Sequence, residues 1–101
     1  MITHTAHPRI VIDDEGRRNL GTMSKIQMER LVAIADAYPQ FEFYVVRFED
    51  NLFNIEVFDD GRAIAVVSAQ FATCRAADRP IAQRIGLEIY GTEALRFRTL
   101  H

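Results

Sequence analysis

A chain of 101 residues is expected to form one domain over residues 1–101, with residues 1–8 as a flexible arm. Hydrophobic residues make up 49% and charged residues 26%, which is ordinary globular usage and excludes wholesale disorder. The net charge of −2 argues against a protein built mainly to bind nucleic acid or an anionic membrane.

The cellular setting is predicted from the cysteine count and from the N-terminus. Cys74 is the single cysteine, so no internal disulfide can form and a reducing, cytoplasmic setting fits best. The start, MITHTAHPRI, lacks the basic segment and apolar run of a signal peptide. No apolar run approaches the roughly 20 residues that cross a bilayer, so we expect a soluble protein without a membrane partner.

The first predicted elements are a short strand and a well-marked helix. RIVID (9–13) is β-branched and predicts a strand or an extended arm. Ser24 and Gln27 have the spacing of a helix capping box, and Pro39 ends the helix that follows. The predicted apolar stripe of this helix comprises Met28, Leu31, Val32, Ala35 and Tyr38.

Three strands are expected next, in a segment rich in aromatic and acidic residues. Residues 41–61 hold five of the seven phenylalanines and six of the fourteen carboxylates. Asp60-Gly61 predicts a tight type I′ hairpin, with Val57 opposite Ile64. Because side chains alternate along a strand, this hairpin has one apolar face. The predicted face comprises Phe53, Ile55, Val57, Ile64 and Val66.

Two registers remain open for the preceding hairpin, and they put different side chains inside. With a three-residue loop over 49–51, the inward set is Phe41, Phe43 and Val45. With Asp50-Asn51 as a two-residue turn, the inward set is Tyr44, Val46 and Phe48. In both cases we expect the helix to pack on the phenylalanine-rich face, since burial of one such side chain is worth about 1.5–3 kcal/mol.

The C-terminal third predicts a second helix and a last strand. Residues 68–78 are ambiguous between a loop and a helical turn. Pro80 and Gly91 favour a helix over 79–91, although LEIY within it also fits a strand. Residues 93–100 alternate as a strand does.

The expected fold class is therefore α+β, in the order β-α-β-β-β-α-β. An antiparallel sheet, with a central three-stranded meander plus terminal strands, packs against one main helix and a shorter C-terminal helix.

Catalytic, cofactor and metal motifs are not evident. The five glycines do not cluster as in a phosphate-binding loop, and no serine lies in a nucleophile-elbow pattern. His4 and His7 lie in a loose terminus instead of a rigid ligand pair. We expect no cofactor and no metal, and we favour a non-enzymatic protein.

An alternative is a small enzyme or ligand-binding domain with a pocket between helix and sheet. Glu42, Glu56 or Cys74 would then carry the chemistry. Paired carboxylates can raise one pKa for acid–base work, and a thiol beside a cation can form thiolate.

Charge is segregated along the chain. Residues 36–60 sum to −6 and residues 61–101 to +3. Acidic turns favour a basic protein partner, because surface charges steer association, and exposed aromatics serve as anchors. The candidate partner-binding residues are Tyr44, Phe48, Glu49, Asp50, Glu56, Phe58, Asp59 and Asp60. An alternative basic face for nucleic-acid contact comprises Arg75, Arg79, Arg84, Arg96 and Arg98, although the negative net charge disfavours it.

The sequence therefore predicts a small protein–protein binding module that occupies a partner's surface, as inhibitors, immunity proteins and phage or mobile-element accessory proteins do. An outer sheet face that is partly apolar in either register also favours a homodimer.

Overall fold

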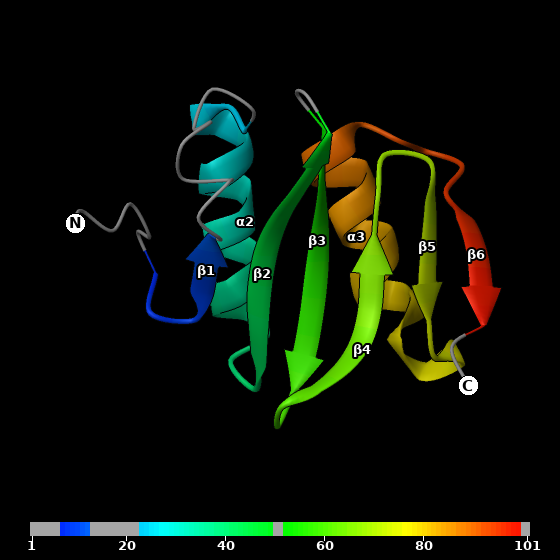
Figure 1. Ribbon diagram of the computed structural model, residues 1–101, viewed down its shortest axis with the longest axis horizontal. Helices are drawn as coiled ribbons and strands as arrows, with labels where there is room; N and C mark the ends of the chain where they lie inside the picture. Colours follow the sequence, from blue (N-terminus) through cyan, green and yellow to red (C-terminus); the bar gives the residue numbers. More distant parts are fainter. Residues whose placement is uncertain (1–6, 13–22, 50–51, 100–101) are drawn as a thin grey trace.

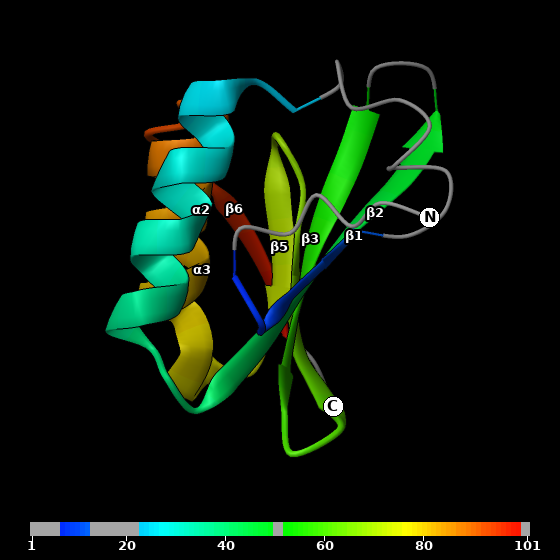
Figure 2. The same cartoon turned by 90° about the vertical axis from the view of Figure 1, so that its left-hand side faces the viewer.

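The computed structural model describes residues 7–12, 23–49 and 52–99, apart from the side chains of residues 47–49. The described residues form a six-stranded sheet whose strands lie in chain order, with two helices on one face (Figure 1, Figure 2). The strands are β1 (Ile10–Ile12), β2 (Phe41–Glu49), β3 (Leu52–Asp59), β4 (Arg62–Val67), β5 (Phe71–Cys74) and β6 (Arg96–Thr99). The helices are α2 (Lys25–Ala37) and α3 (Arg79–Tyr90), the latter preceded by the 3-10 turn η2 (Ala76–Asp78).

The predicted α+β class is confirmed, but the sheet is mixed. Strands β2 to β5 form an antiparallel meander, whereas β1 is parallel to β2 and β6 is parallel to β5. In both parallel pairs a helix connects the two strands, and such a crossover brings the chain back in the same direction. The expected purely antiparallel sheet is therefore wrong at both edges. Strand β5 is an additional strand within residues 68–78.

Helix α2 begins and ends where local signals predict. The Gln27 N–H donates to Ser24 Oγ at 3.1 Å, and the Ser24 N–H donates to Gln27 Oε1 at 2.9 Å. These two bonds confirm the capping box. The helix ends at Ala37, with Tyr38 as its cap before Pro39. Its buried residues are Leu31, Ile34 and Ala35, of which Ile34 lies outside the predicted stripe.

The β3–β4 hairpin has the predicted turn but a different register. Asp60 and Gly61 have φ angles of 51° and 78°, as a type I′ turn requires. Beyond it the register shifts, so that Val57 pairs with Ala65 and not with Ile64. A β-bulge of this kind adds one residue to one strand. Ile64 therefore stays buried, and the prediction that Val66 faces the core is wrong.

The β2–β3 hairpin also contains a register shift, and it decides between the two predicted faces. Arg47 pairs with Phe53, whereas Glu49 pairs with Leu52. Residue 48 is thus an additional residue on β2. As a result, the three-residue alternative describes the inward set correctly: Phe41, Phe43 and Val45 are buried under the helices.

The core fills the space between sheet and helices. Phe43, Ile55 and Val57 on the sheet, with Leu31 and Ile85 on the helices, have no solvent exposure. Pro80 lies in the first turn of α3, and Gly91 ends the helix in the left-handed conformation. The helix predicted over 79–91 is therefore confirmed, and LEIY is not a strand. None of the helices described here has the length and apolar content required to cross a membrane.

Arg9, which no sequence pattern marks, connects the start of β1 to α2 and β2. The Arg9 guanidinium donates to the carbonyl oxygens of Ala35 at 2.6 Å, Tyr38 at 3.0 Å and Phe41 at 2.6 Å. These carbonyls belong to the end of α2 and the start of β2, and a cation there satisfies open helix carbonyls. His7, part of the expected arm, is buried, with Nε2 2.8 Å from Asp36 Oδ1. Residues 1–6 of that arm lie outside the described residues.

Candidate protein-binding face

Both helices pack on one side of the sheet (Figure 2), and no described helix packs on the opposite side, which we call the outer face. Pairing across the strands places one residue of each strand in a row on it. From β1 to β6 the row reads Val11, Tyr44, Glu56, Val66, Thr73 and Arg98. The outer face therefore carries a carboxylate on one side of its centre and a guanidinium on the other.

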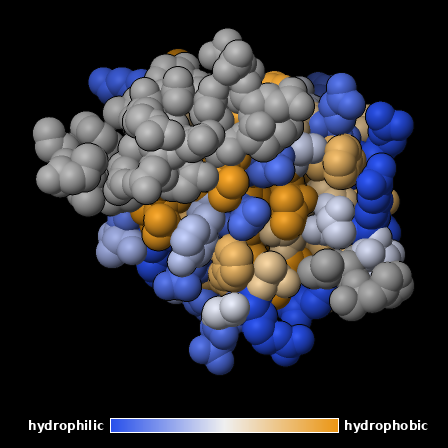
Figure 3. All heavy atoms as spheres, in the orientation of Figure 1, coloured by the Kyte–Doolittle hydropathy of each residue, from blue (hydrophilic) through white to orange (hydrophobic). Residues whose placement is uncertain are grey.

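Aromatic and aliphatic side chains lie among the charged groups of the outer face. The Tyr44 and Phe58 rings meet edge to face, with centroids 4.9 Å apart. Both are half-buried, as is Val66. Val11 and Leu52 retain 39% and 43% of their exposure. Figure 3 shows apolar residues gathered over the middle strands on this side of the molecule.

The acidic side of the outer face is formed by β2 and β3. Glu42 lies opposite Phe58, and Glu56 lies opposite Tyr44, so the two carboxylates are diagonal neighbours on this face. Of the other predicted acids, Asp59 and Asp60 lie at the β3–β4 turn. Asp50 and the side chains of Phe48 and Glu49 lie outside the described residues.

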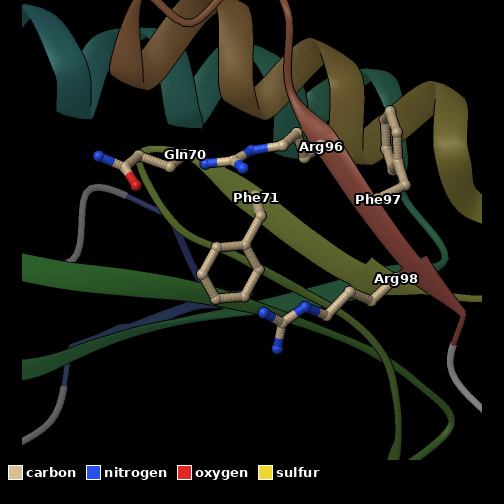
Figure 4. A pocket seen from close by; sticks show the side chains of 5 residues that line it. All are labelled: Gln70, Phe71, Arg96, Phe97 and Arg98. Atoms are coloured by element: carbon tan, nitrogen blue, oxygen red, sulfur yellow. The ribbon is translucent and has the colours of Figure 1, made fainter.

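The basic side is formed by β6. Arg98 stacks on Phe71, with its guanidinium carbon 4.6 Å from the ring centroid. In Figure 4 Arg96 extends toward Gln70, whereas Phe97 points to the other side of the strand. A hollow of about 370 Å³ lies here, lined by Gln70, Phe71, Arg96, Phe97 and Arg98. Within the described ranges, neither Arg96 nor Arg98 forms a salt bridge.

A second hollow, of about 380 Å³, adjoins the first across Gln70 and Phe71. Its lining residues are Leu52, Asn54, Ser68, Ala69, Gln70 and Phe71. The β4–β5 turn between the hollows is fixed, because the Ser68 hydroxyl donates to the Phe71 carbonyl at 2.9 Å and Arg96 N–H donates to Gln70 O at 3.2 Å. These hydrogen bonds therefore hold the β4–β5 turn, which lines both hollows.

Asn54, in this second hollow, carries a buried side-chain oxygen. Its Oδ1 is buried and accepts no hydrogen bond from any described residue. A buried polar atom without a partner costs about 1–3 kcal/mol.

The five predicted basic residues do not share one face. Arg75 bonds Asp78 at 2.6 Å, and Arg84 bonds Glu88 at 2.7 Å. Arg79 stacks over the Phe97 ring, which lies on the helix side of β6. Arg96 and Arg98 alone among these five lie on the outer face.

The residues of the alternative catalytic prediction lie on different sides of the sheet. Cys74 points into the core with 2% exposure, whereas Glu42 and Glu56 lie on the outer face. Burial raises the pKa of the Cys74 thiol, although Arg79 opposes this shift. The thiol is therefore held in its unreactive protonated form. Across residues 7–12, 23–49 and 52–99, no group of three or more His, Cys, Asp and Glu side chains is placed to hold a metal ion.

Several residues of the outer face are not evident from the sequence. Val66 reaches it only through the bulge in β4, and Phe71 only because residues 71–74 form a strand. Phe58, by contrast, is predicted from alternation together with the Asp60-Gly61 turn, whereas Tyr44 faces outward in only one of the two predicted registers. Comparison of the chain with protein-family models, with curated proteins and with solved structures finds no match.

Proposed function

We propose that this protein is a small non-enzymatic protein-binding module whose docking surface is the outer face of the sheet. One observation supports this above the others: both helices pack on one side, and the other side carries Tyr44 and Phe58 uncovered by any described element. Aromatic residues at the centre of an interface are the usual anchors of binding. The module acts by occupying the surface of its partner, as inhibitors and immunity proteins do.

The charges of the outer face define the chemistry of a partner. An apolar group is needed opposite Val66, and the rings of Tyr44 and Phe58 accept either an apolar group or a guanidinium. Basic groups are needed opposite Glu42 and Glu56, and acidic groups opposite the arginines of β6. Complementary charges of this kind suppress wrong partners and fix the orientation of the complex.

An affinity-capture experiment with matched variants tests this function. The immobilised protein is incubated with lysate of its native host, and bound proteins are quantified by mass spectrometry at low and high salt. We expect Tyr44→Ala with Phe58→Ala to lose the stoichiometric partner. The control, Ile26→Ala with Leu87→Ala, removes two exposed apolar side chains from the helices and should retain it. Loss of the partner in the helix variant alone would move the docking surface to the helices.

A second candidate function is the binding of a small anion in the hollow beside β6. The observation that favours it is the pair of guanidiniums of Arg96 and Arg98 around Phe71. Carboxylates and phosphates are the groups that arginine binds best. We expect members of a panel of aromatic carboxylates and phosphates to raise the melting temperature, and Arg96→Ala with Arg98→Ala to abolish the shift. A panel without effect on the wild type would reject this candidate.

A further inference from the structure

We propose that the outer face pairs with the same face of a second copy of this chain, in a two-fold dimer whose axis runs parallel to the strands along β4. The inference rests on the proposed function, because it names a partner for the same docking surface. That face carries carboxylates and aromatic rings on β2 and β3, Val66 on β4 and arginines on β6, so its partner needs the same groups in the reverse order. The outer face itself has this arrangement, so it is its own complement.

The charge pattern selects one direction for the two-fold axis. The carboxylates lie on β2 and β3, the guanidiniums lie on β6, and β4 lies midway between β2 and β6. An axis parallel to the strands places β2 over the partner's β6, so acids face arginines. An in-plane axis across the strands places each strand over its own copy, so acids face acids. Like charges brought together at an interface cost several kcal/mol, which excludes the second arrangement.

The row across the sheet gives the contacts of the selected arrangement. Val66 lies on the axis and meets Val66 of the partner subunit. Arg98 lies over the partner's Tyr44, which has Glu56 opposite it on β3 and Glu42 as its next same-face neighbour on β2. A guanidinium at this place stacks on the ring and binds a carboxylate at the same time. The dimer contains this contact twice.

The overlap of two outer faces fits a weak dimer. The axis along β4 overlaps the five strands β2 to β6, which about 4.8 Å apart span about 19 Å, and the rows of outward side chains extend at most about 20 Å along the strands. Each copy therefore buries about 400 Å², or about 800 Å² in total, in the range of weak, transient interfaces. Two such sheets pack about 10 Å apart with their strands about 30° from parallel. We accordingly expect a dimer that dissociates on dilution.

Sedimentation velocity over a concentration series tests the dimer with two charge-reversed variants. The acid-reversed variant carries Glu42→Arg and Glu56→Arg, and the base-reversed variant carries Arg96→Glu and Arg98→Glu. Each places like charges across the interface, so we expect each to weaken self-association at least about tenfold. An equimolar mixture of the two variants should restore a dimer, because each supplies the charge that the other requires. Thermal melts of both variants test whether each is folded.

The control variant replaces two carboxylate side chains that lie away from the outer face with arginine. Glu29 on α2 and Glu93 between α3 and β6 are exposed, and Glu29→Arg with Glu93→Arg changes the net charge as the acid-reversed variant does. It should dimerise like the wild type. If the wild type is a monomer at every concentration, if either reversal leaves the dimer intact, or if the mixture does not associate, the proposal is overturned. If partner capture from the lysate still depends on Tyr44 and Phe58, the proposed function stands and self-pairing alone fails.

Discussion

Tyr90 anchors the C-terminal helix to two strands through a single hydroxyl group. The Tyr90 hydroxyl donates to the carbonyl oxygens of Phe53 at 2.7 Å and Val67 at 3.3 Å. Its ring stacks on Phe53 with centroids 5.2 Å apart. We expect Tyr90→Phe to lower the free energy of unfolding by about 1–2 kcal/mol, because the bond is lost while the ring contact is kept. Urea denaturation measures the loss, and Tyr38→Phe is the control because the Tyr38 hydroxyl bonds no described residue. An equal loss in both variants would contradict the assignment.

Two weakly acidic groups, the half-buried phenol of Tyr90 and the buried thiol of Cys74, predict a fold that becomes less stable in alkali. Burial raises the pKa of the Tyr90 phenol above 10.0 and the pKa of the Cys74 thiol above 9.0. As the pH rises through these ordinary values, the unfolded chain loses both protons while the folded chain keeps them. The unfolded state then binds fewer protons, so the free energy of unfolding falls with pH.

The loss of stability in alkali has an upper limit, and a comparison with Tyr90→Phe shows the part that Tyr90 contributes. Each group contributes a slope of at most about 1.4 kcal/mol per pH unit. We expect the urea midpoint to fall between about pH 8 and about pH 11, and to fall less in Tyr90→Phe. A wild-type midpoint independent of pH over this range would show that neither group is ionised earlier in the unfolded chain.

Residue-level features could be predicted where both partners lie close in the sequence. Ser24 and Gln27 are three residues apart, and their capping box follows from that spacing alone. Arg9 contacts carbonyls 26 to 32 residues away, and Tyr90 contacts carbonyls 23 and 37 residues away. Such contacts exist only once the sheet is assembled, so no local pattern in the sequence marks them.

At the scale of elements, the β3–β4 turn makes the clearest prediction. Gly61 has a φ of 78°, and a Cβ there would meet nothing within 4 Å. The cost of a side chain at this position is therefore conformational and not steric. We expect Gly61→Val to lower the free energy of unfolding by about 1–2 kcal/mol, and Gly61→Asn to cost less because asparagine tolerates the left-handed region. Thermal melts of both variants test the order. A Gly61→Val variant as stable as the wild type would contradict the type I′ assignment.

Local sequence patterns predict which segments form helices and most strands, but they do not predict how the strands pair. The helices have caps, proline and glycine signals, and an apolar period, and both were predicted. No sequence signal marks the bulge at Ile64. Ile64 and Ala65 are neighbours and both are buried, whereas regular alternation buries only one of two neighbours. The sequence alone does not show where the alternation is interrupted. Strand β5 has four residues, and its length is below what alternation can establish.

At the scale of the molecule, the sequence predicts charge segregation but not where the charges meet. The acidic middle and basic C-terminal third are visible in the composition of each segment. That β6 closes one edge of the sheet, parallel to β5, follows from the crossover through α3. This topology brings Arg96 and Arg98 to the same face as Glu42 and Glu56, with β6 four strands away from β2. The interface prediction therefore required the structure.

Salt separates the forces that hold the fold from those that hold the proposed dimer. The core is apolar and is not weakened by screening, whereas the acid–arginine contacts lie at the rim of the dimer interface, where added salt weakens them. Raising the salt concentration from low to well above physiological should shift the sedimentation equilibrium toward monomer. The urea midpoint of the acid-reversed variant, measured over the same range, should change little. A dimer that strengthens with salt would mean that apolar contacts alone hold the two faces together, and that the charges do not set the axis.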